Sequence, residues 1–206
     1  MAPKMEFWFE FASTYSYLSV MRLSDLARDR GVSVAWRPLL LGPIFAEQGL
    51  TTSPFNLYPG KGAYMWRDME RRAAKFGIPF RRRAPGDSVP FPQNGLKAAR
   101  LALIGLDADW GQAFCRSVFQ AQFVEGADIS DEGLLGKLAD QAGAPADATT
   151  QANAEVNKLR LRDSVEDAKT KGLFGAPSFV VGEELFWGDD RLEDALDWAA
   201  IRQLSS

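Results

Sequence analysis

The first 37 residues combine two periodicities, and this pattern most constrains what the chain can fold into. Apolar residues recur at every second position from Met5 to Phe11, which predicts a strand. The apolar spacing then becomes helical up to about Arg30, and the period of two returns from Val32 to Trp36. A strand, a helix and a second strand in so short a stretch have the size of a βαβ unit with a right-handed crossover.

The last 52 residues predict a helix, a β-hairpin and a final helix. A helical apolar stripe runs through residues 161–168. Two short apolar runs follow, at 179–181 and 185–187. The pair Gly182 and Glu183 between them suits a two-residue type II′ turn.

The middle of the chain, about 40–150, has helical spacing broken by proline- and glycine-rich pieces and contains no convincing strand. We therefore expect an α/β, thioredoxin-like fold, βαβ…αββα, that is interrupted by an all-helical insertion. On this prediction residues 1–40 and 151–206 form the thioredoxin-like domain, and residues 41–150 form the helical insertion domain.

Two residue counts exclude most redox and metal chemistry. The chain has no histidine and one cysteine, Cys115, so catalysis by His and a Cys-X-X-Cys couple are both excluded. We expect no metal site, and we interpret Cys115 as a small buried hydrophobe. Low cysteine use fits a cytoplasmic protein. We also expect no membrane span and no secretory signal, because no apolar run is long enough and the first residues lead directly into a strand.

Charge is distributed unevenly along the chain. Residues 60–100 carry a net charge of +7 and residues 101–206 a net charge of −10, within a total of −3. The basic segment could attract an anionic small molecule, whereas the overall acidity argues against a nucleic-acid partner. Its three consecutive arginines, 81–83, form either a solvated face or a steering patch for anions.

Ser13 lies just past a predicted strand end and at the start of a predicted helix. A helix N-terminus carries about half a positive charge and stabilises a thiolate placed there. A serine without a neighbouring base is a poor nucleophile, so its functional role would be to donate a hydrogen bond to the thiolate of another molecule. The alternative is that Ser13 only caps the helix.

Three further groups of residues are candidates for ligand contacts. Pro177 could simply open a strand, or in a thioredoxin-like fold it would be cis and expose the backbone of Ala176 to a peptide-like ligand. Asp189 and Asp190 could cap the last helix, or one of them could bind an ammonium group. Loop residues that could contact polar ligand groups, or be ordinary turn and surface residues, are Asn56, Lys61 and Asn94.

Taken in order, the segments 10–18, 61–79, 91–94, 174–177 and 187–192 resemble 2-hydroxychromene-2-carboxylate isomerase. That family is related to the kappa-class glutathione transferases and to the wider DsbA-like group. The resemblance covers nearly the whole chain and implies a thioredoxin domain with a helical insertion, bound glutathione and a homodimer.

The resemblance also implies roles for individual residues. Ser13 would hold the glutathione sulfur, and the backbone of Ala176, before cis-Pro177, would pair with the cysteinyl part. The chain departs from the family pattern at Thr14, where proline is usual, and at Glu10, where aspartate is usual. The other positions matched to glutathione contacts are Asn56 and Lys61, in a loop, and Asp189 and Asp190, at the γ-glutamyl end.

The implied activity is a glutathione-dependent isomerisation between 2-hydroxychromene-2-carboxylate and trans-o-hydroxybenzylidenepyruvate, a reaction of aromatic catabolism. The substrate would be a small aromatic ketoacid. Two alternatives stay open at this point. One is a kappa-like glutathione transferase or peroxidase that uses the same thiolate. The other is a redox-inactive DsbA-like module that binds peptides along Ala176 and Pro177.

Overall fold

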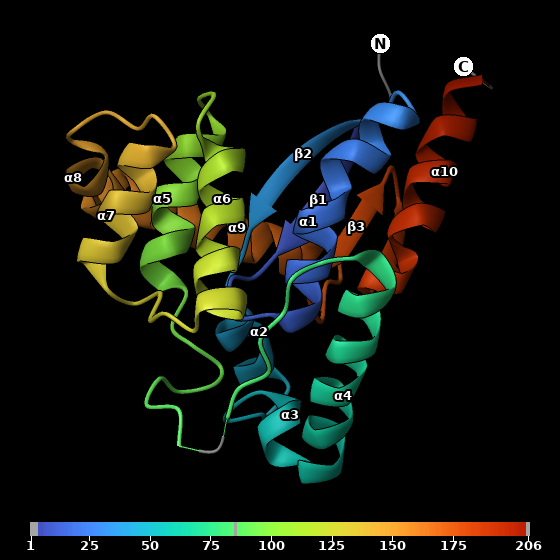
Figure 1. The fold of residues 1–206 in the computed structure, drawn as a ribbon. Helices are drawn as coiled ribbons and strands as arrows, with labels where there is room; N and C mark the ends of the chain where they lie inside the picture. The colour runs from blue at the N-terminus through green and yellow to red at the C-terminus, as the bar shows by residue number, and fades with distance from the viewer. Residues whose placement is uncertain (1–3, 85, 205–206) are drawn as a thin grey trace.

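A mixed four-stranded sheet lies at the centre of the computed structural model, which describes residues 4–84 and 86–204 (Figure 1). Its strand order is β2-β1-β3-β4. The strands are β1 (Lys4–Phe9), β2 (Ser33–Pro38), β3 (Ser178–Val181) and β4 (Glu184–Trp187). β2 is parallel to β1, whereas β3 is antiparallel to both β1 and β4. The prediction of a thioredoxin-like α/β fold is confirmed.

The central strand β1 is apolar because it is buried on both faces. Phe7 pairs with Trp36 of β2 and with Phe179 of β3, and its ring centroid lies 5.3 Å and 5.5 Å from theirs. Trp8 points to the other face, where it joins a second apolar cluster with Val165. Burial on both sides explains why a tryptophan occupies the alternate position of the strand.

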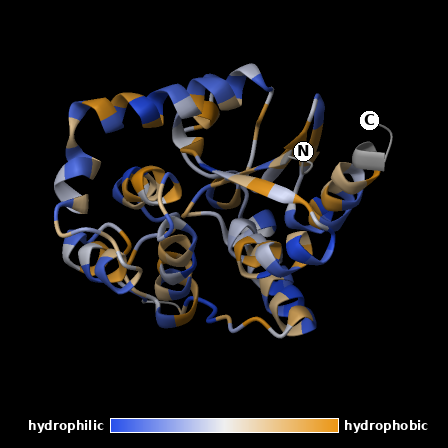
Figure 2. Ribbon diagram, turned by 90° about the horizontal axis from the view of Figure 1, so that it is seen from above, coloured by the Kyte–Doolittle hydropathy of each residue, from blue (hydrophilic) through white to orange (hydrophobic). Residues whose placement is uncertain are grey.

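Helices surround the sheet on several sides (Figure 1). α1 connects β1 to β2, and α10 follows the hairpin and contacts α1. Figure 2 shows hydrophobic and hydrophilic residues on the same helices, as expected of amphipathic helices. The long helices are α1 (Thr14–Asp29), α4 (Pro59–Phe76), α5 (Leu96–Leu106), α6 (Gly111–Gln120), α7 (Glu132–Gln141), α9 (Glu155–Thr170) and α10 (Leu192–Leu204). The short ones are α2 (Leu41–Glu47), α3 (Pro54–Leu57), the π-helical turn η1 (Ala121–Glu125), α8 (Ala148–Asn153) and the 3₁₀ turn η2 (Asp189–Arg191).

Every regular element in the described part of 41–150 is helical, as the periodicity indicates. The domain boundaries themselves stay a prediction. The core continues across them, because the ring of Phe119 in α6 lies 6.1 Å from that of Phe9 and 5.1 Å from that of Phe11. Cys115, on the same helix, is fully buried, as the sequence indicates. No helix among the described residues is long and apolar enough to cross a membrane.

Candidate functional site

A cleft of about 1230 Å³ opens at the ends of β1 and β3, beside the start of α1. Its walls come from the β1–α1 turn, α2 and the loop after it, α4, the 91–96 loop and the segments on either side of the hairpin. The candidate residues that line it are Ser13, Lys61, Asn94, Ala176, Pro177, Asp189 and Asp190. The fold therefore brings together residues that are far apart in the sequence.

Ser13 both caps α1 and reaches across to the opposite wall. Its Oγ accepts a hydrogen bond from the N–H of Ser16 at 3.1 Å and donates one to the carbonyl oxygen of Ala176 at 2.9 Å. The capping interpretation is thus confirmed, and the hydroxyl also makes a second contact, with Ala176. The peptide bond from Ala176 to Pro177 is cis.

The peptide group of Ala176 has free capacity for a ligand. Within the described residues its carbonyl accepts only from Ser13, and no acceptor is bonded to its N–H group. The first-turn N–H groups of a helix also have no intrahelical acceptor, and Thr14 and Tyr15 of that turn line the cleft. The site therefore presents a hydroxyl, a helix N-terminus and an open peptide group side by side.

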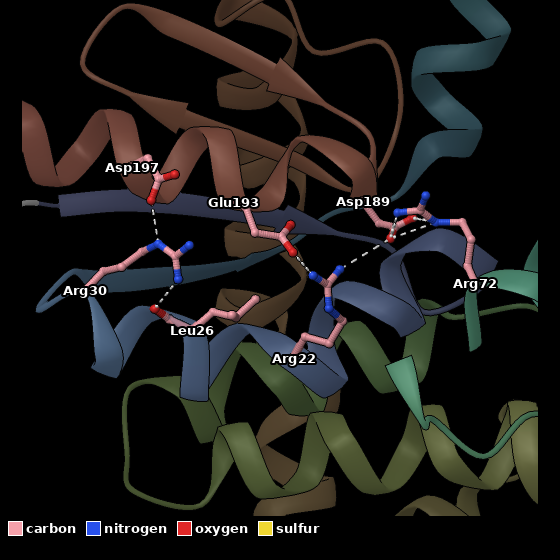
Figure 3. Close-up of polar contacts among 7 residues, drawn as sticks. All are labelled: Arg22, Leu26, Arg30, Arg72, Asp189, Glu193 and Asp197. Carbon is pink, nitrogen blue, oxygen red and sulfur yellow. Dashed lines mark hydrogen bonds and ion pairs between the residues drawn. The ribbon is translucent and has the colours of Figure 1, made fainter. Parts of the chain in front are cut away.

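Asp189 is held by two arginines (Figure 3). Its carboxylate accepts from Arg72 of α4, with Nε at 3.0 Å from Oδ1 and Nη2 at 2.7 Å from Oδ2. Nη1 of Arg22 in α1 lies 3.7 Å from Oδ2, and Arg22 also pairs with Glu193 of α10. Burial raises the pKa of Asp189, and the two guanidinium groups oppose that shift. The carboxylate of Asp189 thus links η2 to α1 and to α4 at the edge of the cleft.

Asp190 is the more accessible of the two carboxylates. Its side chain is 55% exposed and bonds to Arg191 at 3.1 Å, whereas that of Asp189 is 1% exposed. Asp189 and Asp190 both lie in the first turn of η2, whose N-cap residue is Gly188, and their role as caps of the last helix stays a prediction. A ligand ammonium group would find its free oxygen atoms on Asp190 and not on Asp189.

Asn56 and Lys61, which the sequence places in or beside loops, lie in the helices α3 and α4, and their polar groups point to different surroundings. Lys61 lines the cleft, and its ammonium group lies 4.7 Å from the ring centroid of Tyr58. Asn56 does not line the cleft, because its amide donates to the carbonyl of Phe91 at 2.9 Å and to Thr52 at 3.3 Å. The structure gives Asn56 a role in fixing the 91–96 loop, and its contact with glutathione stays a prediction. The third, Asn94, lines the cleft and accepts from the N–H of Leu96.

The consecutive arginines 81–83 lie outside the cleft and are paired within the chain. Arg81 and Arg83 face Asp87, and Arg82 faces Glu70. The basic side chains that line the cleft are instead Lys61 and Arg72. This favours a solvated face over anion steering for the arginine run.

Several cleft residues were not identified as site candidates from the sequence. Glu10 and Arg72 line the cleft but lie in ordinary strand-end and helical patterns. Phe174 and Trp187 form a rim, with ring centroids 4.9 Å apart. Gly175 lies under this rim, where a Cβ atom would approach the Trp187 indole nitrogen to 2.4 Å. Among these residues, only Glu10 carries a signal in the sequence, because it departs from the family pattern, in which aspartate is usual.

Comparison with known proteins gives consistent matches along nearly the whole chain. The family model of the DSBA-like thioredoxin domain matches residues 4–197. The 2-hydroxychromene-2-carboxylate isomerase of Sphingobium xenophagum is 29% identical over 94% of this chain and 96% of its own, and that of Pseudomonas putida is 27% identical over 91% and 90%. A solved structure of 2-hydroxychromene-2-carboxylate isomerase has a TM-score of 0.83 at 25% identity and covers 98% of this chain and 96% of its own.

Proposed function

The chain belongs to the DSBA-like thioredoxin family, and from this premise we propose that it is a glutathione-dependent isomerase of the 2-hydroxychromene-2-carboxylate type. The isomerase class agrees with the names of the relatives, which cover nearly all of the chain. One observation carries the proposal. The position at the start of α1, opposite cis-Pro177, holds the hydroxyl of Ser13 where a redox-active relative needs a thiol.

The residues of the cleft fit glutathione in its chemistry. The open N–H group of Ala176 suits a peptide carbonyl, Lys61 suits a carboxylate, and the exposed carboxylate of Asp190 suits an ammonium group. A tripeptide thiol offers all three of these groups. When bound, glutathione would supply a nucleophilic thiolate that makes rotation about a conjugated double bond accessible.

The chain's own contribution is to hold a thiolate and to orient the ketoacid. Ser13 would turn its hydroxyl from Ala176 toward the sulfur, and the first-turn N–H groups of α1 would add the helix dipole. A free thiol has a pKa of about 8.5, so a shift of about 2 units would make most of the bound thiol ionised at neutral pH. Lys61 and Arg72 are the basic residues available for the substrate carboxylate.

Calorimetric titration of glutathione into the wild type and Ser13→Ala tests this proposal, together with thiolate absorbance recorded across pH. We expect the wild type to bind glutathione with a thiol pKa about 2 units below the free value, and Ser13→Ala to lose most of that shift. Asp131→Ala is the matched control, because Asp131 caps α7 outside the cleft. No binding by the wild type at millimolar glutathione would contradict the proposal and favour a peptide-binding module.

Turnover of hydroxychromene carboxylates then separates the isomerase from a kappa-like transferase or peroxidase, because only the isomerase converts them without consuming glutathione. We extend the proposal to a cytoplasmic homodimer, on the sequence resemblance. Light scattering should then give twice the chain mass of 22.7 kDa. A mass of one chain at micromolar concentration would contradict the dimer.

A further inference from the structure

Glu10 is a buried carboxylic acid in the wall of the cleft. It is 8% exposed and lies in the turn that joins β1 to α1. The N–H group of Ser13 donates to the backbone carbonyl of Glu10 at 3.0 Å and closes this turn. The carboxyl group of Glu10 and the hydroxyl of Ser13 are therefore presented to one cleft by the same short turn.

The two carboxylate oxygens of Glu10 have different surroundings. Oε2 accepts a hydrogen bond from the N–H of Leu41, the first residue of α2. Oε1 lies under Gly95, where an added Cβ atom would be 3.5 Å away, and Gly95 also lines the cleft. Within the described residues no lysine or arginine forms an ion pair with Glu10. One oxygen thus remains available for a ligand.

Burial raises the pKa of Glu10 to about 7, and the N–H group of Leu41 opposes this shift. The group therefore changes its protonation state close to neutral pH, in contrast with an exposed glutamate. None of the other ionisable residues that line the cleft is hydrogen-bonded or ion-paired to it. They come from α1, α4 and η2 and are Tyr15, Lys61, Tyr64, Asp68, Arg72, Asp189 and Asp190.

We propose that Glu10 is the proton-transfer residue that opens and closes the hemiketal ring of the substrate, an inference that rests on the proposed function. In 2-hydroxychromene-2-carboxylate one carbon bears a hydroxyl group, a carboxylate and the ring oxygen. Oε1 takes the hydroxyl proton while the O–H electron pair forms the ketone. The bond from that carbon to the ring oxygen breaks, and its electron pair leaves on the phenolate oxygen.

The proton then passes from Glu10 to the phenolate, which regenerates the carboxylate and leaves an open ketoacid with a phenol. One residue can serve as base and acid in this sequence because its pKa is close to the working pH. Positioned proton transfer typically contributes about 10²–10⁴-fold to a rate. A purely structural Glu10 would only hold the start of α2 through Leu41.

The variants Glu10→Gln and Glu10→Asp separate these two roles. Glutamine keeps an acceptor for the N–H of Leu41 but cannot take up or release a proton near neutral pH, whereas aspartate keeps the carboxyl group. We expect Glu10→Gln to lower kcat by about 100-fold and to leave the glutathione thiol as the one ionisation near neutral pH in kcat/KM, and Glu10→Asp to retain a second ionisation from its carboxyl group. The matched control is Glu47→Gln in α2, which is exposed, lies outside the cleft and pairs with Lys169.

A second readout needs neither turnover nor glutathione. Carboxyl carbon-13 spectra of glutamate-labelled wild type should contain one signal that titrates near pH 7 and shifts when substrate is added. A Glu10→Gln variant with wild-type kcat and pH profile would overturn this inference alone. So would a wild-type spectrum without such a signal, even if Glu10→Gln did not fold. A wild type that never turns over the substrate would overturn the proposed function and this inference together.

Discussion

Ser13 and Glu10 illustrate how one turn combines a stabilising residue with a destabilising one. Ser13 satisfies a helix N–H group and a loop carbonyl at once, so it contributes to the fold while it faces the cleft. Glu10 is buried without a cationic partner among the described residues, and a buried carboxylate in that setting opposes folding. A group of this kind is retained where its chemistry is used, which is consistent with its place in the proposed site.

The free energy needed to bury the ionised carboxylate of Glu10 should appear when the stabilities of Glu10→Gln and the wild type are compared across pH. Between the ordinary value of 4.5 and the folded pKa of about 7, the unfolded chain has released the proton that the folded protein keeps. The wild type therefore loses stability as pH rises through this range, and the loss is complete above it. The free energy of unfolding of Glu10→Gln, minus that of the wild type, should therefore rise by about 3 kcal/mol from about pH 4.5 to about pH 8.

Urea unfolding at these two pH values measures the difference. Glu47→Gln, whose side chain is exposed, should change by less than about 0.5 kcal/mol between them. Parallel pH dependences for the wild type and Glu10→Gln would show that the carboxyl group of Glu10 titrates as an ordinary glutamate.

At the scale of elements, the neighbours Asp189 and Asp190 should differ strongly in their effect on stability. Asp189→Asn removes the charge that holds Arg72 of α4 and Arg22 of α1, and leaves two guanidinium groups partly buried. We expect a loss of about 3 kcal/mol in the free energy of unfolding. Asp190→Asn breaks only an exposed pair with Arg191 and should cost less than about 0.5 kcal/mol. Urea unfolding of the two variants measures this difference. Equal losses in the free energy of unfolding would contradict the ion pairs of Asp189 shown in Figure 3.

The same elements show what could be predicted from the sequence. β1 and α1 follow from local periodicity, and the cap at Ser13 follows from its position between them. The pairing of Arg72 with Asp189 joins residues 117 positions apart, and nothing in either local pattern indicates it. The amide of Asn56 is likewise bonded to a carbonyl 35 positions away. Local patterns therefore indicated candidate ligand residues, but not which of them still have free polar atoms after folding.

At the scale of the whole molecule, the helical segment between β2 and β3 shares its core with the sheet. Phe119 of α6 lies against Phe9 and Phe11, and Tyr17 of α1 is 6.4 Å from it, ring to ring. The sheet contributes only one part of this apolar cluster, and the inserted helices contribute the other. Neither part can bury its aromatic residues without the other, so we infer one cooperative unit in a chain that is interrupted in sequence.

The variant Phe119→Ala tests whether the sheet and the inserted helices unfold as one cooperative unit. Removal of a fully buried ring should cost about 3–5 kcal/mol, and in one cooperative unit the amides of β1 and of α6 should lose the same free energy of exchange. Hydrogen exchange measures the free energy for the amides of β1 and α6. Urea unfolding, monitored by circular dichroism, measures the overall loss of stability. Phe174→Ala is the matched control, because that ring is 44% exposed and should cost about 1 kcal/mol or less. If α6 lost protection while β1 kept its wild-type free energy, the helical segment would be an independent domain, and the shared aromatic core would not couple it to the sheet.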